Sequence, residues 1–486
     1  MPLTWRAVLD ELRRSDLLVS APSAAPDPTG ITVDSRTIQR GALYIAVRGS
    51  QTDGHRFVDQ AVNRGAGAVL VEAPQQAGVP EIVVHDSRRS ALVLGAAWHA
   101  YPARSLTLIG VTGTNGKTTT TNLIRHLFND QHRAGSIGTL GAFDGMDEPV
   151  SSTAGSLTTP GPIDLQATLA ALVERGVTHV AMEASSHSLD QGRLDGLAFS
   201  AAVFTNLTHD HLDYHGTMEA YLSAKLRLSD LLSLSAPEVV NLEEDAWRTM
   251  PPRSPRLTFG RHPAADVRAS GIVLDAAGSR FQLNGCFGSA EASLPLLGDF
   301  NVSNALAAAT AALGLELPLS LIVERLVCAP QVPGRMERLS ETPCVVLRDY
   351  AHTPDALERA LVSLRPLTRG RLIVVFGCGG DRDKGKRPVM GRIAAALSDL
   401  AIATSDNPRT EDPGAIIDDI ERGMVGMPHL RITNRLAAIH TALNEGRPGD
   451  TVLLAGKGHE TYQVIGADRL PFDEREIVQR AVRGEK

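Results

Sequence analysis

The pattern of apolar and polar positions changes twice along the chain. Up to about residue 98, short apolar runs such as GALYIAVRG and EIVVHDS are separated by turn residues, which predicts a small α/β domain. From residue 99, apolar strand-like segments alternate with polar loops and helix-like segments, and this alternation predicts a mainly parallel sheet. A turn-rich stretch, APQVPGRMERL, interrupts the alternation near Val332. We therefore expect an α/β fold of three domains, over residues 1–98, 99–332 and 333–486.

The predicted strands of the second and third domains end in loops that contain glycine or polar residues. In the third domain, RLIVVFGCGG, LAIATSDNP and DTVLLAGKGHE each pass from a strand-like run into glycine or aspartate. Ligands of open parallel sheets bind at the carboxyl ends of the strands. Both domains are thus expected to present functional loops at such an edge.

Composition and charge exclude several functions. A formal net charge of -7 and an aromatic content of 4% argue against nucleic acid as a partner. No apolar run has the length that spans a bilayer, and the start of the chain is typical of an amphipathic helix and not of a signal peptide. The four cysteines are widely spaced, which is typical of free thiols in a reducing cytoplasm. We expect a cytoplasmic protein without membrane insertion.

The stretch GVTGTNGKTTT is the clearest candidate for a phosphate site. The strict pattern G-x-x-x-x-G-K-[ST] fails, because Val111 stands where its first glycine belongs. Its physical parts are nevertheless present: a strand, a glycine-containing loop, and a helix predicted to start near Lys117, whose N-terminus favours anions. Lys117 suits the outer phosphates and the Thr118 hydroxyl suits Mg²⁺. The alternative is a simple glycine-rich turn, but the Lys-Thr pair favours a nucleotide.

Two later strand ends supply candidate magnesium ligands. Glu183 closes the strand-like run HVAME, and His211 lies in the polar segment THDHLDYHG. Together with Thr118, each offers one ligand to Mg²⁺; on its own, the polar segment is equally typical of a solvated loop. Lys225 lies in a helix-like stretch, and its spacing alone predicts a surface lysine.

A series of segments in one order resembles the Mur ligases. The segments are GVTGTNGKTTT, MEASSHSLDQGRLDG, FTNLTHDHLDYHG, AYLSAK, LLGDFNVSNALAA, VPGRMERL, DYAHTPDAL, FGCGGDRDKGKRPVM, DNPR and GKGHE. The resemblance implies an N-terminal UDP-binding domain, a central ATPase domain and a Rossmann-like C-terminal domain. It also implies a reaction of peptidoglycan precursor synthesis: ATP phosphorylates the D-glutamyl carboxylate of UDP-N-acetylmuramoyl-L-Ala-D-Glu, and the amine of an amino acid then attacks the acyl phosphate.

The resemblance assigns the chemistry residue by residue. It makes Lys117, Lys225 and His211 catalytic, and Lys225 the lysine that the family carboxylates on its side-chain nitrogen. The metal ligands that it implies for Mg²⁺ are Thr118, Glu183, His211 and Lys225. Its ATP-binding residues are Gly113, Thr114, Asn115, Gly116, Lys117, Thr118, Thr119, Asn301, Asn304, Arg335, Asp349 and His352.

The resemblance also implies a binding site for the UDP-linked substrate. The implied residues are Val33, Ser35, Ser50, Gln51, Thr52, Thr158, Thr159, Ser185, Gln191 and Arg193. Hydroxyls such as those of Ser35 and Thr158 also commonly cap turns, and without the resemblance that interpretation is favoured.

The segment SDNPRTEDP bears on which amino acid is added. Asn-Pro simply favours a turn, but in the family the sequence D-N-P-R accompanies ligases for meso-diaminopimelate, and ligases for L-lysine lack the arginine. The physics agrees, because diaminopimelate carries an additional distal carboxylate that Arg409 can bind bidentately, while Glu460 takes the distal ammonium. The implied contacts are Arg382, Asp406, Asn407, Pro408, Arg409, Gly456 and Glu460.

Three other functions stay open from the sequence. The same ligase can add L-lysine, a relative can add glutamate to folate, or the chain can be a nucleotide-gated binding protein without turnover. The N-terminal VDSRTIQRG and the DNPR segment argue against folate. The expected ligands are ATP, Mg²⁺, UDP-N-acetylmuramoyl-L-Ala-D-Glu and meso-diaminopimelate, and we expect a monomer.

Overall fold

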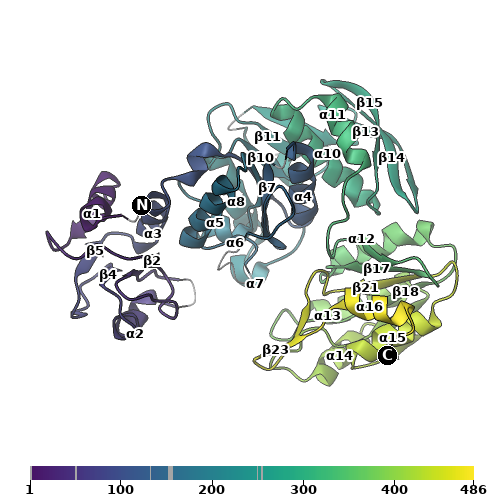
Figure 1. The fold of residues 1–486 in the computed structure, drawn as a ribbon. Helices are drawn as coiled ribbons and strands as arrows, with labels where there is room; N and C mark the ends of the chain where they lie inside the picture. Colours follow the sequence, from purple (N-terminus) through teal and green to yellow (C-terminus); the bar gives the residue numbers. More distant parts are fainter. Residues whose placement is uncertain are drawn as a thin grey trace.

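The computed structural model of the chain describes residues 3–49, 52–131, 133–150, 157–248, 250–252 and 255–485. Three separate sheets follow one another along the chain, each with its own helices (Figure 1). In the view of Figure 1 the N-terminal unit lies at the left, the central unit at the top and the C-terminal unit at the lower right. The α/β fold of three domains is confirmed.

The N-terminal unit is a five-stranded sheet in the order β1-β5-β4-β3-β2, parallel except for β1. Its strands are β1 (Leu18–Ser20), β2 (Ile31–Thr32), β3 (Leu43–Ile45), β4 (Ala68–Val71) and β5 (Glu81–Val84). Its helices are α1 (Trp5–Arg14), η1 (Gly54–Phe57), α2 (Val58–Asn63) and α3 (Ser87–Trp98), and η2 (Pro102–Ser105) leads out of it. The apolar sides of α1 and α3 pack on one face of the sheet and α2 packs on the other.

The central unit is built on a ten-stranded sheet in the order β15-β14-β13-β12-β11-β10-β6-β9-β7-β8. Its strands are β6 (Thr107–Thr112), β7 (Ala134–Gly138), β8 (Gly141–Phe143), β9 (His179–Glu183), β10 (Ala201–Phe204), β11 (Glu238–Asn241), β12 (Arg256–Gly260), β13 (Val267–Asp275), β14 (Gly278–Gly285) and β15 (Gly288–Leu294). The middle strands are parallel, while β8, β14 and β15 pair antiparallel with their neighbours. The sequence pattern did not predict this antiparallel extension.

Helices cover both faces of the central sheet. They are α4 (Lys117–Phe128), α5 (Pro162–Glu174), α6 (Ser186–Asp190), α7 (Leu212–His215), α8 (Met218–Asp230), α9 (Asp245–Arg248), α10 (Asp299–Gly314) and α11 (Leu319–Val327). Ile109 and Val111 of β6 point to the core beneath α4 and α10, while Leu108 points to the opposite core with α5 and α8. Because successive strand residues face opposite sides, a strand with apolar residues on both sides must be buried in the middle of the sheet.

The C-terminal unit has a six-stranded sheet in the order β16-β17-β21-β18-β19-β20, parallel except for β16. Its strands are β16 (Glu337–Ser340), β17 (Val345–Asp349), β18 (Leu372–Phe376), β19 (Leu400–Ala403), β20 (His429–Arg431) and β21 (Thr451–Ala455), with a separate hairpin of β22 (Tyr462–Ile465) and β23 (Asp468–Pro471). Its helices are α12 (Pro354–Leu364), η3 (Arg365–Leu367), α13 (Lys386–Leu397), α14 (Pro413–Glu421), α15 (Arg435–Glu445) and α16 (Glu474–Val482). One face packs against α12, α13 and α14, the other against α15 and α16.

The order of the strands within each sheet determines which loops lie next to one another. The strand β6 lies between β9 and β10, and β21 lies between β17 and β18. The carboxyl ends of parallel neighbours lie at one edge of a sheet, so the loops that follow them converge.

The exact bounds of the three domains remain predictions. Among the described residues, no helix is long and apolar enough to cross a membrane.

Candidate active site

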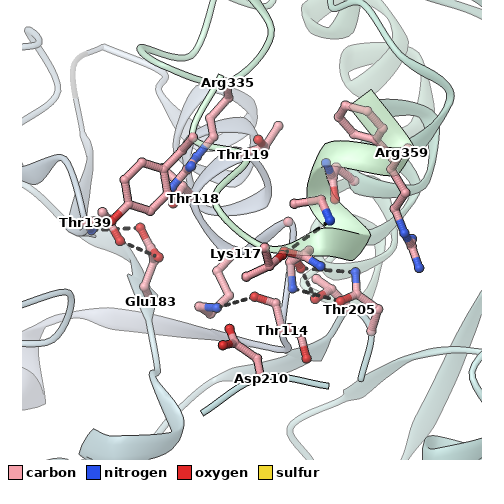
Figure 2. A pocket seen from close by; sticks show the side chains of 18 of the residues that line it. Thr114, Lys117, Thr118, Thr119, Thr139, Glu183, Thr205, Asp210, Arg335 and Arg359 are labelled. Atoms are coloured by element: carbon pink, nitrogen blue, oxygen red, sulfur yellow. Dashed lines mark hydrogen bonds between the residues drawn. The ribbon is translucent and has the colours of Figure 1, made fainter. Parts of the chain in front are cut away.

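A cavity of about 710 Å³ opens at the carboxyl edge of the central sheet and is closed on its far side by the C-terminal unit. The loops after β6, β7, β9 and β10 supply its floor, and one side of α12 and the segment around Tyr350 supply the opposite wall. Figure 2 shows this cavity from close by. It contains polar side chains from segments more than 200 residues apart in sequence.

The loop between β6 and α4 has the backbone of a phosphate-binding turn. Gly113 (φ +146°) and Gly116 (φ +85°) adopt conformations that favour glycine. A Cβ at Gly116 would collide with Oδ1 of Asn304, and one at Gly113 would collide with the Thr205 hydroxyl. The helix α4 begins at Lys117 as predicted. The loop is therefore held open by two glycines at the N-terminus of a helix, where an anion is stabilised.

Two lysines converge on one carbonyl of this loop. Lys117 Nζ donates to the carbonyl oxygens of Gly113 (2.9 Å) and Thr114 (2.7 Å), and Lys225 Nζ donates to Gly113 O at 2.7 Å. Lys225 is 1% exposed and lies 4.3 Å from the centre of the Tyr221 ring. The expectation of a surface lysine from spacing alone was wrong, because α8 packs against the face of the sheet beside β6 and directs this side chain toward the loop that follows the strand.

Burial changes the acid–base chemistry of both lysines. Burial lowers the pKa of Lys117. Burial, reinforced by the charge of nearby Lys117, holds the pKa of Lys225 well below its usual value. A lysine with a strongly lowered pKa carries a larger neutral fraction, and the neutral amine is the nucleophilic form. Both amino groups lie at the loop where a phosphate would bind.

Glu183 is fixed at the end of β9. It is 1% exposed, and Thr139 donates to it twice, from its backbone N (2.8 Å) and its hydroxyl (3.1 Å) (Figure 2). Gly138 leaves room for the carboxylate, since a Cβ there would collide with it. His211 caps α7 with φ +53°, and burial lowers its pKa, which favours the neutral form able to bind a metal.

The donor set suits a magnesium ion that also binds phosphate. Thr118, Glu183 and His211 all line the cavity, and they offer a hydroxyl, a carboxylate and an imidazole. In the part of the chain that the structure describes, no group of three or more His, Cys, Asp or Glu residues is placed to hold a metal. Mg²⁺ commonly takes one or two protein ligands and completes its shell with water and phosphate, so the residues fit this use.

The C-terminal unit contacts the phosphate loop directly. Arg335 donates to the Thr118 hydroxyl at 3.0 Å (Figure 2), and the Asn115 side chain donates to Asp355 at 3.0 Å. Asp349 accepts from the backbone N of Met336 at 2.7 Å, and burial raises its pKa. Burial lowers the pKa of His352 to about 4. The three C-terminal residues predicted for ATP (Arg335, Asp349 and His352) therefore all line the cavity.

The two asparagines of α10 have different surroundings. Asn304 lines the cavity and donates to Oδ1 of Asn301 at 2.9 Å. Asn301 is 1% exposed and donates to the Leu297 carbonyl at 2.6 Å, and it is not a lining residue. The structure thus places Asn301 behind Asn304, as its support.

The residues predicted for the UDP-linked substrate form two groups. Thr158, Thr159, Ser185 and Arg193 line the cavity. Gln191 lies next to them and accepts from Arg193 Nε (3.0 Å) and Nη2 (2.6 Å). The remaining described members, Val33, Ser35 and Thr52, lie in the N-terminal unit, away from the cavity lining.

Two further observations concern the residues of the N-terminal unit that are predicted to bind the UDP-linked substrate. The Ser35 hydroxyl donates to Gln60 at 2.7 Å. Ser50 and Gln51 lie outside the described residues.

A second polar cluster lies at the carboxyl edge of the C-terminal sheet, and it contains the residues predicted for diaminopimelate. Asp406, Asn407 and Pro408 are buried after β19. Arg409 adopts φ +51° and donates to the Gly380 carbonyl at 2.8 Å. Asn407 donates to Glu460 at 2.8 Å.

Glycines give this second cluster its space. Gly379 lies against the guanidinium of Arg409 and the side chain of Arg382. Gly456 (φ +114°) lies against the Asp406 carboxylate. All the residues predicted for diaminopimelate thus lie in the loops after β18, β19 and β21.

Several polar residues of both clusters were missed in the sequence. Asp355 and Tyr221 contact the phosphate loop, and Lys457 lies at the centre of the second cluster. Lys457 follows the apolar run TVLLA after one glycine, a position that signals a strand-end residue. Asp355 has no such signal, because its partner Asn115 is 240 residues away.

The fold and this cavity define a nucleotide-dependent α/β enzyme with a phosphate loop and a C-terminal unit that reaches into the same site. Family models match the chain in three segments: "Mur ligase family, catalytic domain" at residues 28–100, "Mur ligase middle domain" at 111–312 and "Mur ligase, glutamate ligase domain" at 334–458. The chain belongs to the Mur ligase family.

Relatives over nearly the whole length agree with this assignment. The chain is 46% identical to the UDP-N-acetylmuramoyl-L-alanyl-D-glutamate--2,6-diaminopimelate ligase of Gloeobacter violaceus over 464 residues, which covers 94% of each chain. It is 43% identical to the enzyme of that name from Geobacillus kaustophilus over 472 residues, with 94% of this chain and 95% of the relative covered. A solved structure of a ligase of that name matches 100% of this chain and 99% of its own with a TM-score of 0.66 and 34% identity.

Proposed function

We propose that the protein is the ATP-dependent ligase that adds meso-2,6-diaminopimelate to the D-glutamate of UDP-N-acetylmuramoyl-L-Ala-D-Glu in peptidoglycan synthesis. The observation that carries this function is the identity of 43–46% over 94% of the chain to relatives of that name. The phosphate loop of the central unit and the polar cluster of the C-terminal unit supply the residues for it. We expect the active protein to be a monomer in the cytoplasm.

In this proposal the first step takes place in the cavity at the phosphate loop. The backbone of Gly113–Gly116 and the side chain of Lys117 bind the ATP phosphates, and Lys117 exchanges its contacts to Gly113 O and Thr114 O for phosphate oxygens. Three anionic groups, the triphosphate, the substrate carboxylate and Glu183, meet here, so cations must offset their repulsion. Thr118, Glu183 and His211 would hold Mg²⁺, which would supply charge stabilisation of the transferred phosphoryl group.

Lys225 is proposed to be carboxylated on Nζ. Its burial and lowered pKa support this, because only the neutral amine adds to CO₂, and one N–H proton is released as the carbamate forms. The product would carry a negative charge in place of a positive one at the edge of the metal site. Arg193, which donates to Thr159 O at 3.1 Å, is proposed to orient the incoming dipeptide.

The second step joins the amine to the activated carboxylate. The acyl phosphate reacts readily with water, so the site must exclude it. The cross-domain contacts Arg335–Thr118 and Asn115–Asp355 are the means by which the C-terminal unit would close over the intermediate and present the bound amino acid.

A three-substrate assay with the purified protein tests this function. With ATP, Mg²⁺ and UDP-N-acetylmuramoyl-L-Ala-D-Glu, we expect phosphate release and a product of the mass of the tripeptide with meso-diaminopimelate, and scarcely any with L-lysine. Preferential turnover of L-lysine would make the protein the lysine-adding alternative, and equal turnover of both amino acids would remove the argument from Arg409. Nucleotide binding without ADP release in the presence of all substrates would make it a binding protein.

The Arg409→Ala variant tests the amino-acid site. Removing a guanidinium that binds a carboxylate bidentately is expected to raise KM for meso-diaminopimelate roughly 10- to 100-fold and to leave KM for ATP unchanged. Arg369→Ala, at an exposed arginine of the same unit, is the matched control. An Arg409→Ala variant with an unchanged KM for diaminopimelate would remove this residue from the site.

A further inference from the structure

Lys457 is a fully buried cation at the centre of the C-terminal polar cluster. Its side chain is 0% exposed. Its Nζ lies 3.0 Å from Asn407 Oδ1, 3.3 Å from Asp406 Oδ1 and 3.3 Å from Glu460 Oε2. Burying a lysine is costly unless its charge is compensated, and here all three N–H groups have an oxygen acceptor.

The acceptors of Lys457 come from two separate loops. Asp406 and Asn407 follow β19, whereas Lys457 and Glu460 follow β21. The strand β18 lies between β19 and β21 in the sheet, so strand pairing within the sheet does not join the two loops. Beyond Lys457, backbone bonds join the same segments, since Arg409 N donates to Val464 O at 3.1 Å and Gly466 N donates to Arg409 O at 2.7 Å. Lys457 therefore bridges two loops whose relative position the sheet alone does not fix.

The bridge fixes one oxygen of Glu460. Its Oε2 accepts from Asn407 Nδ2 at 2.8 Å and from Lys457 Nζ at 3.3 Å. Among the described residues, no hydrogen bond is made by Oε1, and the Glu460 side chain is 15% exposed. A carboxylate with one oxygen anchored by two donors presents its other oxygen in a defined direction.

The side-chain amide of Asn407 is also hydrogen-bonded within this network. Its Oδ1 accepts from Lys457 Nζ and from the backbone N of Val464 at 2.9 Å, and its Nδ2 donates to Glu460. An amide with these bonds is rigid and has little capacity left for a ligand. Asn407 therefore acts with Lys457 as part of the support for Glu460.

Lys457 also neutralises part of the negative charge of the cluster. Asp406 and Glu460 bring two negative charges, and Lys457 offsets one of them. Burial acts to raise the pKa of Asp406, but Lys457 and the neighbouring Arg435 hold that pKa below its usual range. Among Lys457, Asp406 and Glu460 alone, one negative charge remains, which matches one ammonium group.

We propose that Lys457 is a positioning residue of the amino-acid site, which anchors Oε2 of Glu460 so that Oε1 accepts the distal ammonium of diaminopimelate. This inference rests on the proposed function, since it takes the loops after β18, β19 and β21 as the diaminopimelate site. Lys457 itself does not touch the substrate and acts through Glu460.

A substrate that lacks the distal ammonium makes the test specific. L-2-Aminopimelate keeps the reacting amine and the distal carboxylate of diaminopimelate. For Lys457→Met we expect kcat/KM with meso-diaminopimelate to fall about tenfold or more, mainly through KM, because the anchored carboxylate is lost. With L-2-aminopimelate the fall should be less than about twofold, since no ammonium is present to lose its partner.

Three further variants separate positioning from folding. Glu460→Gln should show the same substrate dependence, and Lys457→Met combined with Glu460→Gln should lose little beyond either single variant, because both remove one interaction. Lys457→Arg should recover part of the loss. KM for ATP and for the UDP-linked dipeptide should stay unchanged in each variant.

An equal loss on both amino acids would overturn the inference and leave Lys457 with a general structural role. A wild-type protein that does not use meso-diaminopimelate at all would instead overturn the proposed function. If Lys457→Met does not fold because Asp406 is left as a lone buried charge, the pair Asp406→Asn with Lys457→Met is compared with Asp406→Asn alone, and the same two outcomes decide.

Discussion

At the scale of single residues, the C-terminal unit stabilises its site through buried arginines and lysines that each have carboxylate partners. Arg387 is 1% exposed and donates to Glu411 (2.9 and 3.0 Å) and Asp419 (3.0 Å). Glu411 also accepts from the backbone N of Asp381 at 2.6 Å. This carboxylate therefore ties the loop that carries Arg382 to the loop that carries Arg409.

The charge of Glu411 predicts a pH-dependent stability. Its hydrogen bond from Arg387 and the one from the Asp381 backbone lower its pKa to about 2, from an ordinary value of 4.5. Because the ionised form is favoured in the folded state, its contribution to stability is complete above pH 4.5 and is lost as the pH falls toward 2. Glu411→Gln should thus lower Tm at pH 7, and the Tm difference from wild type should shrink steadily below pH 4.5.

Thermal unfolding followed by circular dichroism at a series of pH values measures this difference. Glu358→Gln, the same substitution at an exposed site of α12, shows how much of any change comes from removing one negative charge. A Tm difference for Glu411→Gln that stays constant from pH 7 to pH 3 would contradict the assigned role.

At the scale of elements, the strand–loop–helix unit of β6 and α4 depends on close approach between backbone and side chains. Gly116 has no room for a Cβ because Asn304 of α10 lies directly against it. The loop is also tied to the end of β10, since the Thr205 hydroxyl donates to Asn115 O at 2.7 Å and Asn115 N donates to Asn206 Oδ1 at 2.8 Å. The phosphate loop is thus preorganised by two neighbouring elements.

A pair of glycine substitutions separates backbone strain from steric collision. Gly116 and Gly196 share φ +85°, but Gly196 has open space where a Cβ would lie. Both Ala variants should lose about 1 kcal/mol from the left-handed conformation. Only Gly116→Ala should also raise KM for ATP, by about tenfold or more, because the loop must shift away from Asn304. An equal KM for ATP in the two variants would show that the Asn304 contact is unimportant.

The elements also show what the sequence can predict. Buried parallel strands such as β6, β18 and β21 have continuous apolar runs followed by glycine, so both the strands and their functional loops were predicted. The strands β13 to β15 contain many exposed polar residues, and such a solvated antiparallel extension has no strong apolar pattern. The burial of Lys225 was not predictable from spacing, because its partner is the carbonyl of Gly113, 112 residues away.

At the scale of the whole molecule, side chains that bridge the units connect the three parts of the site. Arg335 and Asn115 join the central and C-terminal units across the cavity. Arg88 of α3 joins the N-terminal and central units, since it donates to the Arg48 carbonyl at 2.5 Å and to the Gln191 carbonyl at 3.0 Å. One guanidinium thus contacts both Gln191, which is predicted to bind the UDP-linked substrate, and Arg48, which precedes the predicted residues Ser50 to Thr52 in the N-terminal unit.

This bridge predicts a selective effect on one substrate. In Arg88→Ala the two segments lose their shared donor, so a ligand that spans them must order them itself. We expect KM for UDP-N-acetylmuramoyl-L-Ala-D-Glu to rise about fivefold, which corresponds to about 1 kcal/mol for hydrogen bonds from a partly exposed arginine. KM for ATP should not change, because the phosphate loop makes no contact with Arg88 in the described structure.

Arg89→Ala is the matched control, since Arg89 is the next residue of the same helix and is exposed. Steady-state kinetics with each substrate varied in turn gives both KM values for both variants. Equal rises for Arg88→Ala and Arg89→Ala would reduce the effect to a change in surface charge. A parallel rise in KM for ATP would mean that Arg88 supports the central unit as a whole, and that the N-terminal unit is not coupled to the substrate site through this side chain.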